Sequence, residues 1–539
     1  MQHQAFFSVA IFITVTGIFP LKALTAERDA KSGLYAIWYP ANSEKYLSQS
    51  YIKGGQIVLQ WKDVETSQGN YDFSQVDERL AELHKRGLFT TIQINGNRKP
   101  SWLFDQVPYI ERKLSVQVRD PKGSLMFWHV THRTAYLSML RAFAAYLRDS
   151  AFEDTLLGLR MNLNAIGTEH HYVPPEYRSL DQWTVPAGVD RAGIAPWSRE
   201  QTDRYIEAVL DTYIDAFQGM ARIFVRNGIP DELEDKYRDA FENGTLSWFH
   251  TSSEVEPRAS WAERKYQRFV NDCRSGRTTA YAEPWASTWG HHGGKTDDRW
   301  CSPPQWGYWR LLFDLHCGVS HIALYSTDMR VAIEGAYSSR GVHYNEPGGP
   351  YQREFNAAFQ FAAKYVGYHA CPENSPGAWV AFRQNSTVRA ANGMSKAARR
   401  LSIFNDDYNF LMRRLPGDSS YAENIVNVGP DEQRFGAWAR ILPAGGSMRL
   451  QVDKAFVDSL QEQPARVTLT YLDQGNAEYR LAAGGQSMNV ACKGTDDWQT
   501  ASLDIVGGQL KPDGEGAHIQ LLAVKGPVYV HMVEVRRSN

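Results

Sequence analysis

The sequence predicts an α/β protein: a (β/α)8 TIM barrel followed by an all-β sandwich of the jelly-roll kind. Three observations lead to this fold class. Apolar runs of strand length alternate with amphipathic stretches between residues 34 and 366, as in a closed parallel barrel. After residue 377 the pattern changes to short alternating runs separated by Gly, Asp and Asn, which is typical of antiparallel sheets. The length of 539 residues also fits more than one domain.

The N-terminus has the pattern of a secretory signal. Residues 6–20 form one apolar run, which is short for a membrane span, and the small residues 23–26 follow it. We therefore expect cleavage near Ala26, a periplasmic or secreted protein, and no membrane association after cleavage.

Eight strands and the helices between them can be assigned in order. The expected strands are 34–39, 56–61, 89–94, 156–164, 222–226, 246–250, 278–282 and 321–326. The expected helices are 76–84, 134–147, 201–217, 231–243, 261–273, 306–317 and 354–366. The fifth strand depends on Gly219 ending the helix before it; the alternative is a helix that continues to Arg226.

The strand count divides the chain into a signal peptide (1–26), a barrel (30–372) and a β-sandwich (376–539). Strands expected in the sandwich are 379–382, 466–471, 518–522 and 528–533. No low-complexity linker separates the two domains, so we expect them to pack against each other.

Composition narrows the function classes. A net charge of -2 with 43% hydrophobic and 22% charged residues is that of a soluble globular protein, and it gives no basic footprint for nucleic acid. Five scattered cysteines form neither a metal-ligand spacing nor a disulfide framework. One bridge, Cys273–Cys301 or Cys317–Cys371, and buried free thiols are the alternatives. The oligomeric state stays open.

Two glutamates follow strands at the predicted catalytic end of the barrel. Glu169 closes the fourth apolar run and Glu283 closes the seventh. Residues at the C-terminal ends of barrel strands face the substrate, and paired carboxylates are what glycosidic bond cleavage needs. The acid of such a pair must keep its proton near neutral pH, which requires a raised pKa.

Motifs around the second and third strands give a family resemblance. They are Trp-Lys-Asp-Val-Glu at 61–65, Gly-Asn-Tyr-Asp-Phe at 69–73, Val-Asp at 76–77 and Pro-Ser-Trp-Leu at 100–103. With these motifs the chain resembles the retaining (β/α)8 glycoside hydrolases of clan A, in the β-galactosidase-like, agarase-like and carrageenase-like branches. The resemblance implies that Glu169 is the acid/base and Glu283 the nucleophile, and that no cofactor is needed.

One position departs from that family pattern. The clan has Asn directly before the acid/base, whereas this chain has Thr168, with Asn162 and Asn164 upstream. Three explanations stay open: Asn164 reaches the sugar from an unusual strand end, the sugar carries a substituent, or the acid is misassigned.

Further residues at the expected mouth are candidates for substrate binding. Imidazoles can bind sugar hydroxyls, anionic substituents or a metal, and tryptophans can stack on sugar rings; solvated loops and core packing are the alternatives. Arg98, beside Lys99, can pair with sulfate or carboxylate, or can be a plain surface charge. The candidates are Trp61, Asn95, Arg98, Trp102, Asn164, His170, His171, His250, Trp285, Trp289, His291, His292 and Tyr325. Trp300 on the same loops is another stacking candidate, and Glu254, Glu256 and Glu334 are alternative carboxylates.

We expect a hydrolase of β-linked oligo- or polysaccharide, with galactans of the agar or carrageenan type as candidates. A noncatalytic carbohydrate-binding protein is one alternative. A polysaccharide lyase using Tyr172 and His171 is another. The sandwich aspartates 406, 407, 453 and 473 could hold structural calcium, although Asp-rich surface turns are the simpler interpretation.

Overall fold

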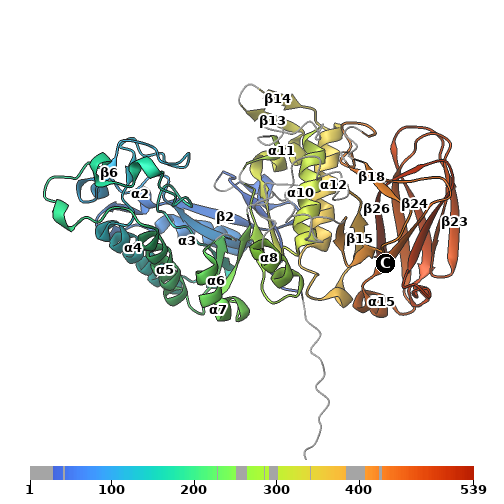
Figure 1. Cartoon of the computed structure of the whole chain (residues 1–539), viewed down its shortest axis with the longest axis horizontal. Helices are drawn as coiled ribbons and strands as arrows, with labels where there is room; N and C mark the ends of the chain where they lie inside the picture. Colours follow the sequence, from blue (N-terminus) through green and yellow to red (C-terminus); the bar gives the residue numbers. More distant parts are fainter. Residues whose placement is uncertain are drawn as a thin grey trace, which may run out of the picture.

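The computed structural model describes residues 28–40, 43–226, 229–250, 264–284, 286–289, 302–339, 342–383, 407–423, 428–436 and 438–538. The predicted signal peptide lies outside the described residues. A barrel and a sandwich lie side by side along the long axis of the molecule (Figure 1).

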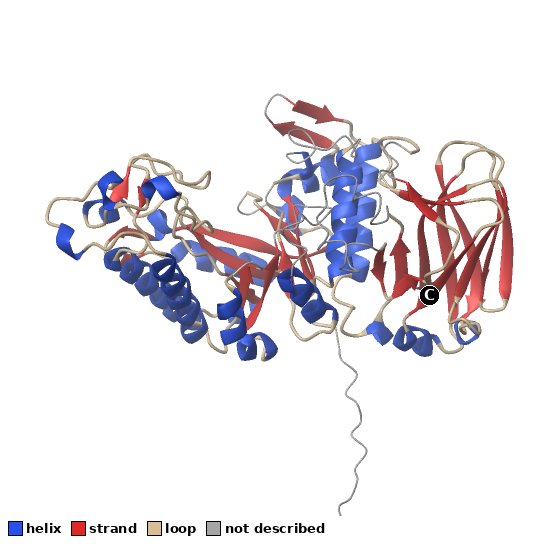
Figure 2. Cartoon of the chain, in the orientation of Figure 1, coloured by secondary structure: helices blue, strands red, loops and turns tan. Residues whose placement is uncertain are grey.

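Eight parallel strands close the barrel in the order β1-β12-β11-β10-β9-β8-β5-β2, which confirms the predicted fold class. Figure 2 shows helices beside these strands and mainly strands in the C-terminal part. They are β1 (Gly33–Ile37), β2 (Ile52–Gln60), β5 (Phe89–Asn95), β8 (Leu156–Arg160), β9 (Arg222–Arg226), β10 (Leu246–His250), β11 (Ala280–Ala282) and β12 (His321–Tyr325). The fifth strand of the barrel, β9, has the predicted bounds. It pairs in parallel with β8 and β10, and Gly219 before it has a φ of 73°. The alternative of a continuous helix to Arg226 is therefore wrong.

The fourth strand is shorter than predicted. β8 ends at Arg160, and residues 161–168 form a loop before Glu169. The backbone turns left-handed at Asn164 (φ 48°) and at Gly167 (φ 73°), and such residues cannot continue a strand. The Asn164 N–H donates to the Thr168 carbonyl at 2.8 Å. Glu169 therefore comes back toward the strand end on a folded loop and does not extend the strand.

Helices follow the strands and cover the barrel. They are α1 (Glu44–Leu47), α2 (Trp61–Val64), α3 (Ser74–Lys85), α4 (Val130–Arg148), α5 (Arg199–Ala216), α6 (Asp231–Lys236), α7 (Arg238–Glu242), α8 (Arg264–Arg274), α10 (Pro303–Cys317), α11 (Ser326–Glu334) and α12 (Pro350–Tyr365). The single helix expected over 231–243 is two short helices that meet at Tyr237. None of the helices in the described ranges has the length and apolar character that crossing a bilayer requires.

Short hairpins decorate the barrel. They pair β3 (Glu65–Ser67) with β4 (Asn70–Tyr71), β6 (Tyr109–Ile110) with β7 (Ser124–Leu125), and β13 (Ala336–Ser339) with β14 (Val342–Asn345). Neither α11 nor the β13–β14 hairpin was expected from the sequence.

Large side chains fill the interior of the barrel. Tyr35, Phe224, Phe249 and Tyr281 belong to one buried cluster, and the rings of Tyr35 and Tyr281 meet edge-to-face with centroids 6.2 Å apart. The barrel is therefore a packed core, so a ligand can enter only above this layer, at the mouth.

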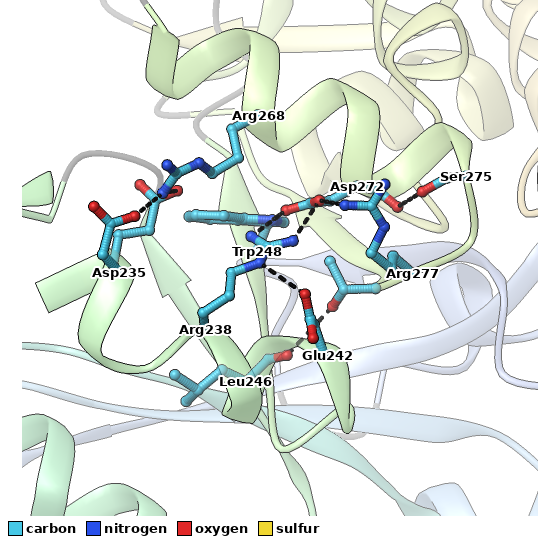
Figure 3. A network of polar contacts seen from close by, with 11 residues as sticks. Asp235, Arg238, Glu242, Leu246, Trp248, Arg268, Asp272, Ser275 and Arg277 are labelled. Atoms are coloured by element: carbon cyan, nitrogen blue, oxygen red, sulfur yellow. Dashed lines mark hydrogen bonds and ion pairs between the residues drawn. The ribbon is translucent and has the colours of Figure 1, made fainter.

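A polar network fixes helices on the outside of the barrel (Figure 3). Asp272 on α8 is buried and accepts two hydrogen bonds from the Arg238 guanidinium, at 2.7 and 2.9 Å. It also accepts from Trp248 Nε1 on β10 at 3.3 Å and from Arg277 at 3.3 Å. Because these donors come from α7, β10 and the loop after α8, Asp272 ties two helices to the sixth strand of the barrel.

The C-terminal domain consists of two antiparallel sheets. The first contains β15 (Gly377–Ala381), β16 (Tyr408–Phe410), β18 (Tyr421–Glu423), β19 (Ala439–Leu442), β21 (Pro464–Leu472), β24 (Trp498–Val506) and β26 (Val528–Arg537). The second contains β17 (Met412–Arg414), β20 (Ser447–Val452), β22 (Glu478–Ala483), β23 (Gln486–Ala491) and β25 (Ile519–Lys525). A separate apolar core fills the space between the sheets, and α15 (Lys454–Leu460) closes one end (Figure 1). The predicted β-sandwich is confirmed.

The sandwich packs directly on helices α10 and α12 of the barrel. Trp309 meets Trp438 edge-to-face with centroids 4.9 Å apart, and its Nε1 donates to the Gly436 carbonyl at 2.8 Å. Arg434 pairs with Glu354 at 2.6 Å. These contacts make the sandwich a cover for one side of the barrel, as the missing linker predicted.

The state of two cysteines excludes both of the disulfide bridges considered above. Cys273 and Cys371 are buried free thiols, so neither candidate bridge, Cys273–Cys301 or Cys317–Cys371, is formed.

Candidate active site

A small cavity of about 160 Å³ lies at the C-terminal mouth of the barrel. Its lining comes from the ends of β1, β5, β8, β10, β11 and β12 and from the loops beside them. The lining residues are Trp38, Asn95, Asn97, Gln117, Arg160, Thr168, Glu169, Phe249, Glu283, Pro284 and Tyr325. Both predicted catalytic glutamates are therefore in one pocket.

A larger cavity of about 850 Å³ lies against β17, β20 and α15 of the sandwich. Its acidic residues are already occupied: Asp453 caps α15 through the N–H groups of Ala455 and Phe456, and Asp458 pairs with Lys454. The carboxylate pair thus identifies the smaller cavity as the candidate active site.

Glu283 directly follows β11 and is held on three sides. Its backbone N–H donates to the His250 carbonyl at 2.9 Å, which continues the pairing of β11 with β10. Its Oε2 accepts from Gln56 Nε2 at 2.9 Å, and its Oε1 accepts from Arg160 Nη1 at 2.9 Å. Burial raises the pKa of Glu283, while Arg160 and Gln56 act in the opposite direction. Its carboxylate is therefore fixed in orientation.

Glu169 reaches the same pocket from the loop after β8. Gln117 Oε1 accepts from the Glu169 backbone N–H at 2.8 Å, which anchors the loop. The Glu169 carboxylate pairs with Arg160 through Oε1 and with Arg226 through Oε2, the latter at 2.7 Å. Only about a tenth of its side chain is exposed.

Arg160 is the centre of this arrangement. One guanidinium contacts Glu169 and Glu283 together, so the two carboxylates face each other across the width of a single planar group. The guanidinium also donates to Gln93 Oε1 at 2.7 Å and stacks on the Phe249 ring at 4.2 Å. Packing and hydrogen bonds together leave it one orientation.

Comparisons with known proteins match one segment of the barrel. A model of glycoside hydrolase family 42, described as β-galactosidase, matches residues 56–150. This segment carries the second and third barrel strands and ends before both glutamates. The matched segment and the closed barrel together indicate a glycosidase that is similar to the clan A barrel hydrolases. No curated protein sequence matches this glycosidase.

Two solved structures are similar to the glycosidase at low identity. Xylanase B from Clostridium stercorarium F9 aligns at 12% identity with a TM-score of 0.30, over 55% of this chain and 85% of that one. A β-galactosidase from Rahnella sp. R3 aligns at 13% identity with a TM-score of 0.34, over 62% of this chain. The glycosidase spans just 57% of that β-galactosidase.

Several predicted binding residues are at or near the pocket of the glycosidase. Asn95 and Tyr325 line it, and burial raises the pKa of Tyr325 to about 12. His170 and His171 follow Glu169; burial lowers both pKa values, and the charge of Arg226 adds to this effect. His170 Nδ1 contacts Ser115 Oγ.

Two predicted stacking tryptophans are half-buried. Trp102 packs against the barrel core. Trp289 stacks on Tyr337 with ring centroids 4.4 Å apart. In both residues the indole N–H is buried without a hydrogen-bond partner among the described residues, so each has an unused donor.

Three predicted contacts need correction because their side chains are buried. Trp61 packs against His132 and Tyr136 and donates to Glu65 Oε2 at 2.8 Å, so it belongs to the core. Asn164 donates to the Ile94 carbonyl at 3.0 Å; the left-handed backbone turns it into the loop. His250 lies against Phe269, and burial lowers its pKa to about 3.

Two further candidates among the described residues, Arg98 and Glu334, do not line the pocket. Arg98 is exposed and does not line it. Glu334 forms an ion pair with Lys45 at 2.5 Å on the surface. Candidates outside the described residues are Trp285, His291, His292, Trp300, Glu254 and Glu256.

The sandwich aspartates have structural partners. Asp407 is buried between Arg414 and Arg440, each at 2.8 Å. Asp473 accepts from the Lys493 and Thr495 N–H groups. Asp406 lies outside the described residues. Within the described ranges no group of three or more His, Cys, Asp or Glu is arranged to hold a metal ion.

The residues of this site that sequence reasoning missed include Trp38, Gln56, Arg160, Arg226 and Phe249. A signal was present for the two arginines. Arg160 and Arg226 are charged residues at the C-terminal ends of barrel strands with apolar centres, where a charge is unfavourable unless it faces the mouth.

Proposed function

We propose that the chain is an exported retaining glycosidase that cleaves a β-linked oligo- or polysaccharide through Glu169 and Glu283. Galactans of the agar or carrageenan type are the first substrates to test. The observation that carries the proposal is the contact of both carboxylates with the one Arg160 guanidinium. Such closeness favours the retaining geometry, in which the carboxyl groups lie about 5–5.5 Å apart, over the wider inverting one.

The environment of each glutamate supports its role. In the first step a Glu283 oxygen attacks the anomeric carbon, and the bond to the leaving oxygen breaks as that oxygen takes the Glu169 proton. In the second step water attacks the glycosyl-enzyme and gives its proton to Glu169, which frees Glu283. Glu283 is suited to the first role because Gln56 and Arg160 fix its two oxygens. Glu169 is suited to proton transfer because its loop brings it to the opposite side of Arg160.

The names of similar proteins support the substrate class. The matching family is described as β-galactosidase, and a β-galactosidase fits the proposed β-linked galactan. The export part rests on the apolar run at 6–20.

Reaction products test the proposal. A panel of plant and red-algal polysaccharides is incubated with the enzyme, and new reducing ends are measured together with the absorbance of unsaturated sugars. Reducing ends without that absorbance are expected. Unsaturated products would indicate a lyase, and binding without any product would indicate a noncatalytic protein.

Azide rescue tests the two roles. Glu283→Ala should regain turnover with azide and give a glycosyl azide of inverted configuration, because azide replaces the nucleophile. Glu169→Ala should give the retained configuration, because azide then attacks the glycosyl-enzyme. Glu334→Ala is a matched control, since it removes a surface carboxylate paired with Lys45, and it should keep full activity. Full activity of either Ala variant at the pocket would refute the assignment.

A further inference from the structure

The charges at the mouth of the pocket point to the kind of substrate. Two arginines contact the two carboxylates: Arg160, which lines the cavity, and Arg226, which pairs with Glu169 from the end of β9. With both glutamates ionised, these four groups carry no net charge. Among the described residues that line the cavity, no other side chain is charged at neutral pH.

The nearby histidines leave this balance unchanged. Burial, and after it the charge of Arg226, lowers the pKa values of His170, His171 and His250. These imidazoles are therefore neutral at neutral pH. In the described part of the chain Arg226 forms one ion pair, the contact with Glu169 Oε2 at 2.7 Å.

The proposed reaction disturbs the balance. Glu169 must carry a proton to act as the acid, and it then no longer neutralises the arginines. These four described groups are then left with one positive charge in excess. An unpaired charge that substrate binding removes from water is strongly unfavourable. With an uncharged sugar, Arg160 and Arg226 would instead hold Glu169 in its ionised form, in which it has no proton to give.

Arg226 is the arginine that can change partners. It ends β9 and its side chain is 42% exposed, whereas Arg160 is about 9% exposed and is fixed by Gln93 and Phe249. A guanidinium is suited to bidentate contact with a planar or tetrahedral anion. An anionic group that reaches Arg226 would replace Glu169 there and would restore the charge balance.

We propose that the substrate carries an anionic substituent, either a sulfate ester or a carboxylate. Arg226 binds this substituent beside the bond that is cleaved, and Glu169 is thereby released from Arg226 to act as the acid. This inference rests on the proposed function for the catalytic part. The binding of the anionic group by Arg226 does not depend on the proposed function.

Binding is measured first, so that the result does not depend on turnover. Sulfated oligosaccharides and their desulfated forms, and uronate oligosaccharides and their carboxyl-reduced forms, are titrated calorimetrically into the full-length Glu283→Gln variant. One charged form is expected to bind at least about 10-fold more tightly than its uncharged partner, as for a hydrogen bond to a charged group. Which pair shows the difference tells sulfate from carboxylate. Adding Arg226→Gln should abolish the preference.

Arg222→Gln is the matched control. Arg222 lies at the opposite end of β9 and pairs with Asp29 at 2.5 Å, far from the mouth. This variant should keep the preference. Equal affinity for the charged and uncharged forms, or a preference that survives Arg226→Gln, overturns the inference.

Turnover then tests the release of Glu169. In the otherwise unmodified enzyme, kcat should be at least about 10-fold higher for the charged form, and Arg226→Gln should remove that ratio. Equal kcat values would refute the release step. If the enzyme cleaves neither these glycans nor aryl β-glycosides and still prefers the charged form in binding, the proposed function fails and the anion site stands.

Discussion

Two buried networks of arginine and carboxylate lie in the same barrel, and they are built differently. Around Asp272 none of the buried polar atoms of Asp272, Arg238 and Trp248 lacks a hydrogen-bond partner. At the mouth, Arg160 Nε, Gln56 Oε1 and Gln93 Nε2 are buried and have no partner among the residues that the structure describes. A fully paired network stabilises the fold, whereas a network with unused donors and acceptors is prepared for a ligand.

The position of each network agrees with this difference. Asp272 connects α7, α8 and β10 on the outside of the barrel (Figure 3). The mouth network connects residues on or directly after β2, β5, β8, β9 and β11 around a cavity. We therefore expect substitutions in the two networks to separate activity from stability.

The largest expected effect is on turnover at the mouth. Glu283→Gln keeps the shape of the side chain and removes the nucleophile, so kcat should fall by about 10³-fold or more. Stability should change little, because Arg160 keeps Glu169 as a partner. Steady-state kinetics and urea unfolding measure the two quantities. A large decrease in the free energy of unfolding of this variant, together with the loss of kcat, would contradict the distinction between the two networks.

The next largest effect is on stability at the outer network. Asp272→Ala leaves Arg238 without its bidentate partner and Trp248 Nε1 without its acceptor. The free energy of unfolding should fall by about 3 kcal/mol. At a temperature where the variant is folded, kcat should be unchanged. A loss of kcat with normal stability would show that this network also positions the mouth.

The third prediction concerns how the stability contributed by the mouth network depends on pH. Burial raises the pKa of Glu283 above its ordinary value of 4.5, so the folded state holds this proton more tightly than the unfolded state does. This contribution to stability is present below pH 4.5 and is lost as the pH rises through the folded pKa. Glu283→Gln cannot titrate. We therefore compare the free energy of unfolding of the unsubstituted enzyme with that of Glu283→Gln at each pH. The value for the unsubstituted enzyme should decrease relative to the variant as the pH rises above 4.5. A difference that stays constant with pH would contradict the raised pKa.

Much of the barrel could be predicted from the sequence because local signals agree with the tertiary structure. The bounds of β9 and β10 follow from Gly219, Pro230 and Gly244, which end or begin elements by their backbone preferences. α11 was missed because it begins at Ser326, directly after β12, with no turn residue between them.

The site could be predicted less completely. The positions of Glu169 and Glu283 at one mouth follow from the strand count, since strand ends of a barrel converge. The loop at 161–168 could not be predicted, because it depends on left-handed backbone at Asn164, which tertiary contacts with Ile94 hold. Trp61 was misplaced because an aromatic residue at the end of a strand looks the same in sequence whether it faces the mouth or the core.

The smallest expected effect completes the comparison with a pair on the protein surface. Arg204 and Glu200 contact each other one turn apart on α5, with about two thirds or more of each side chain exposed. Water solvates both charges before and after folding, so Arg204→Gln should change the unfolding free energy by less than about 0.5 kcal/mol and should leave kcat unchanged. The same urea series that measures Asp272→Ala measures this variant. Because both substitutions break an arginine–carboxylate contact, the difference between them isolates burial as the property that makes the Asp272 network stabilising. An equal loss in the two variants would mean that pairing alone, and not its removal from water, holds α7 and α8 on the barrel.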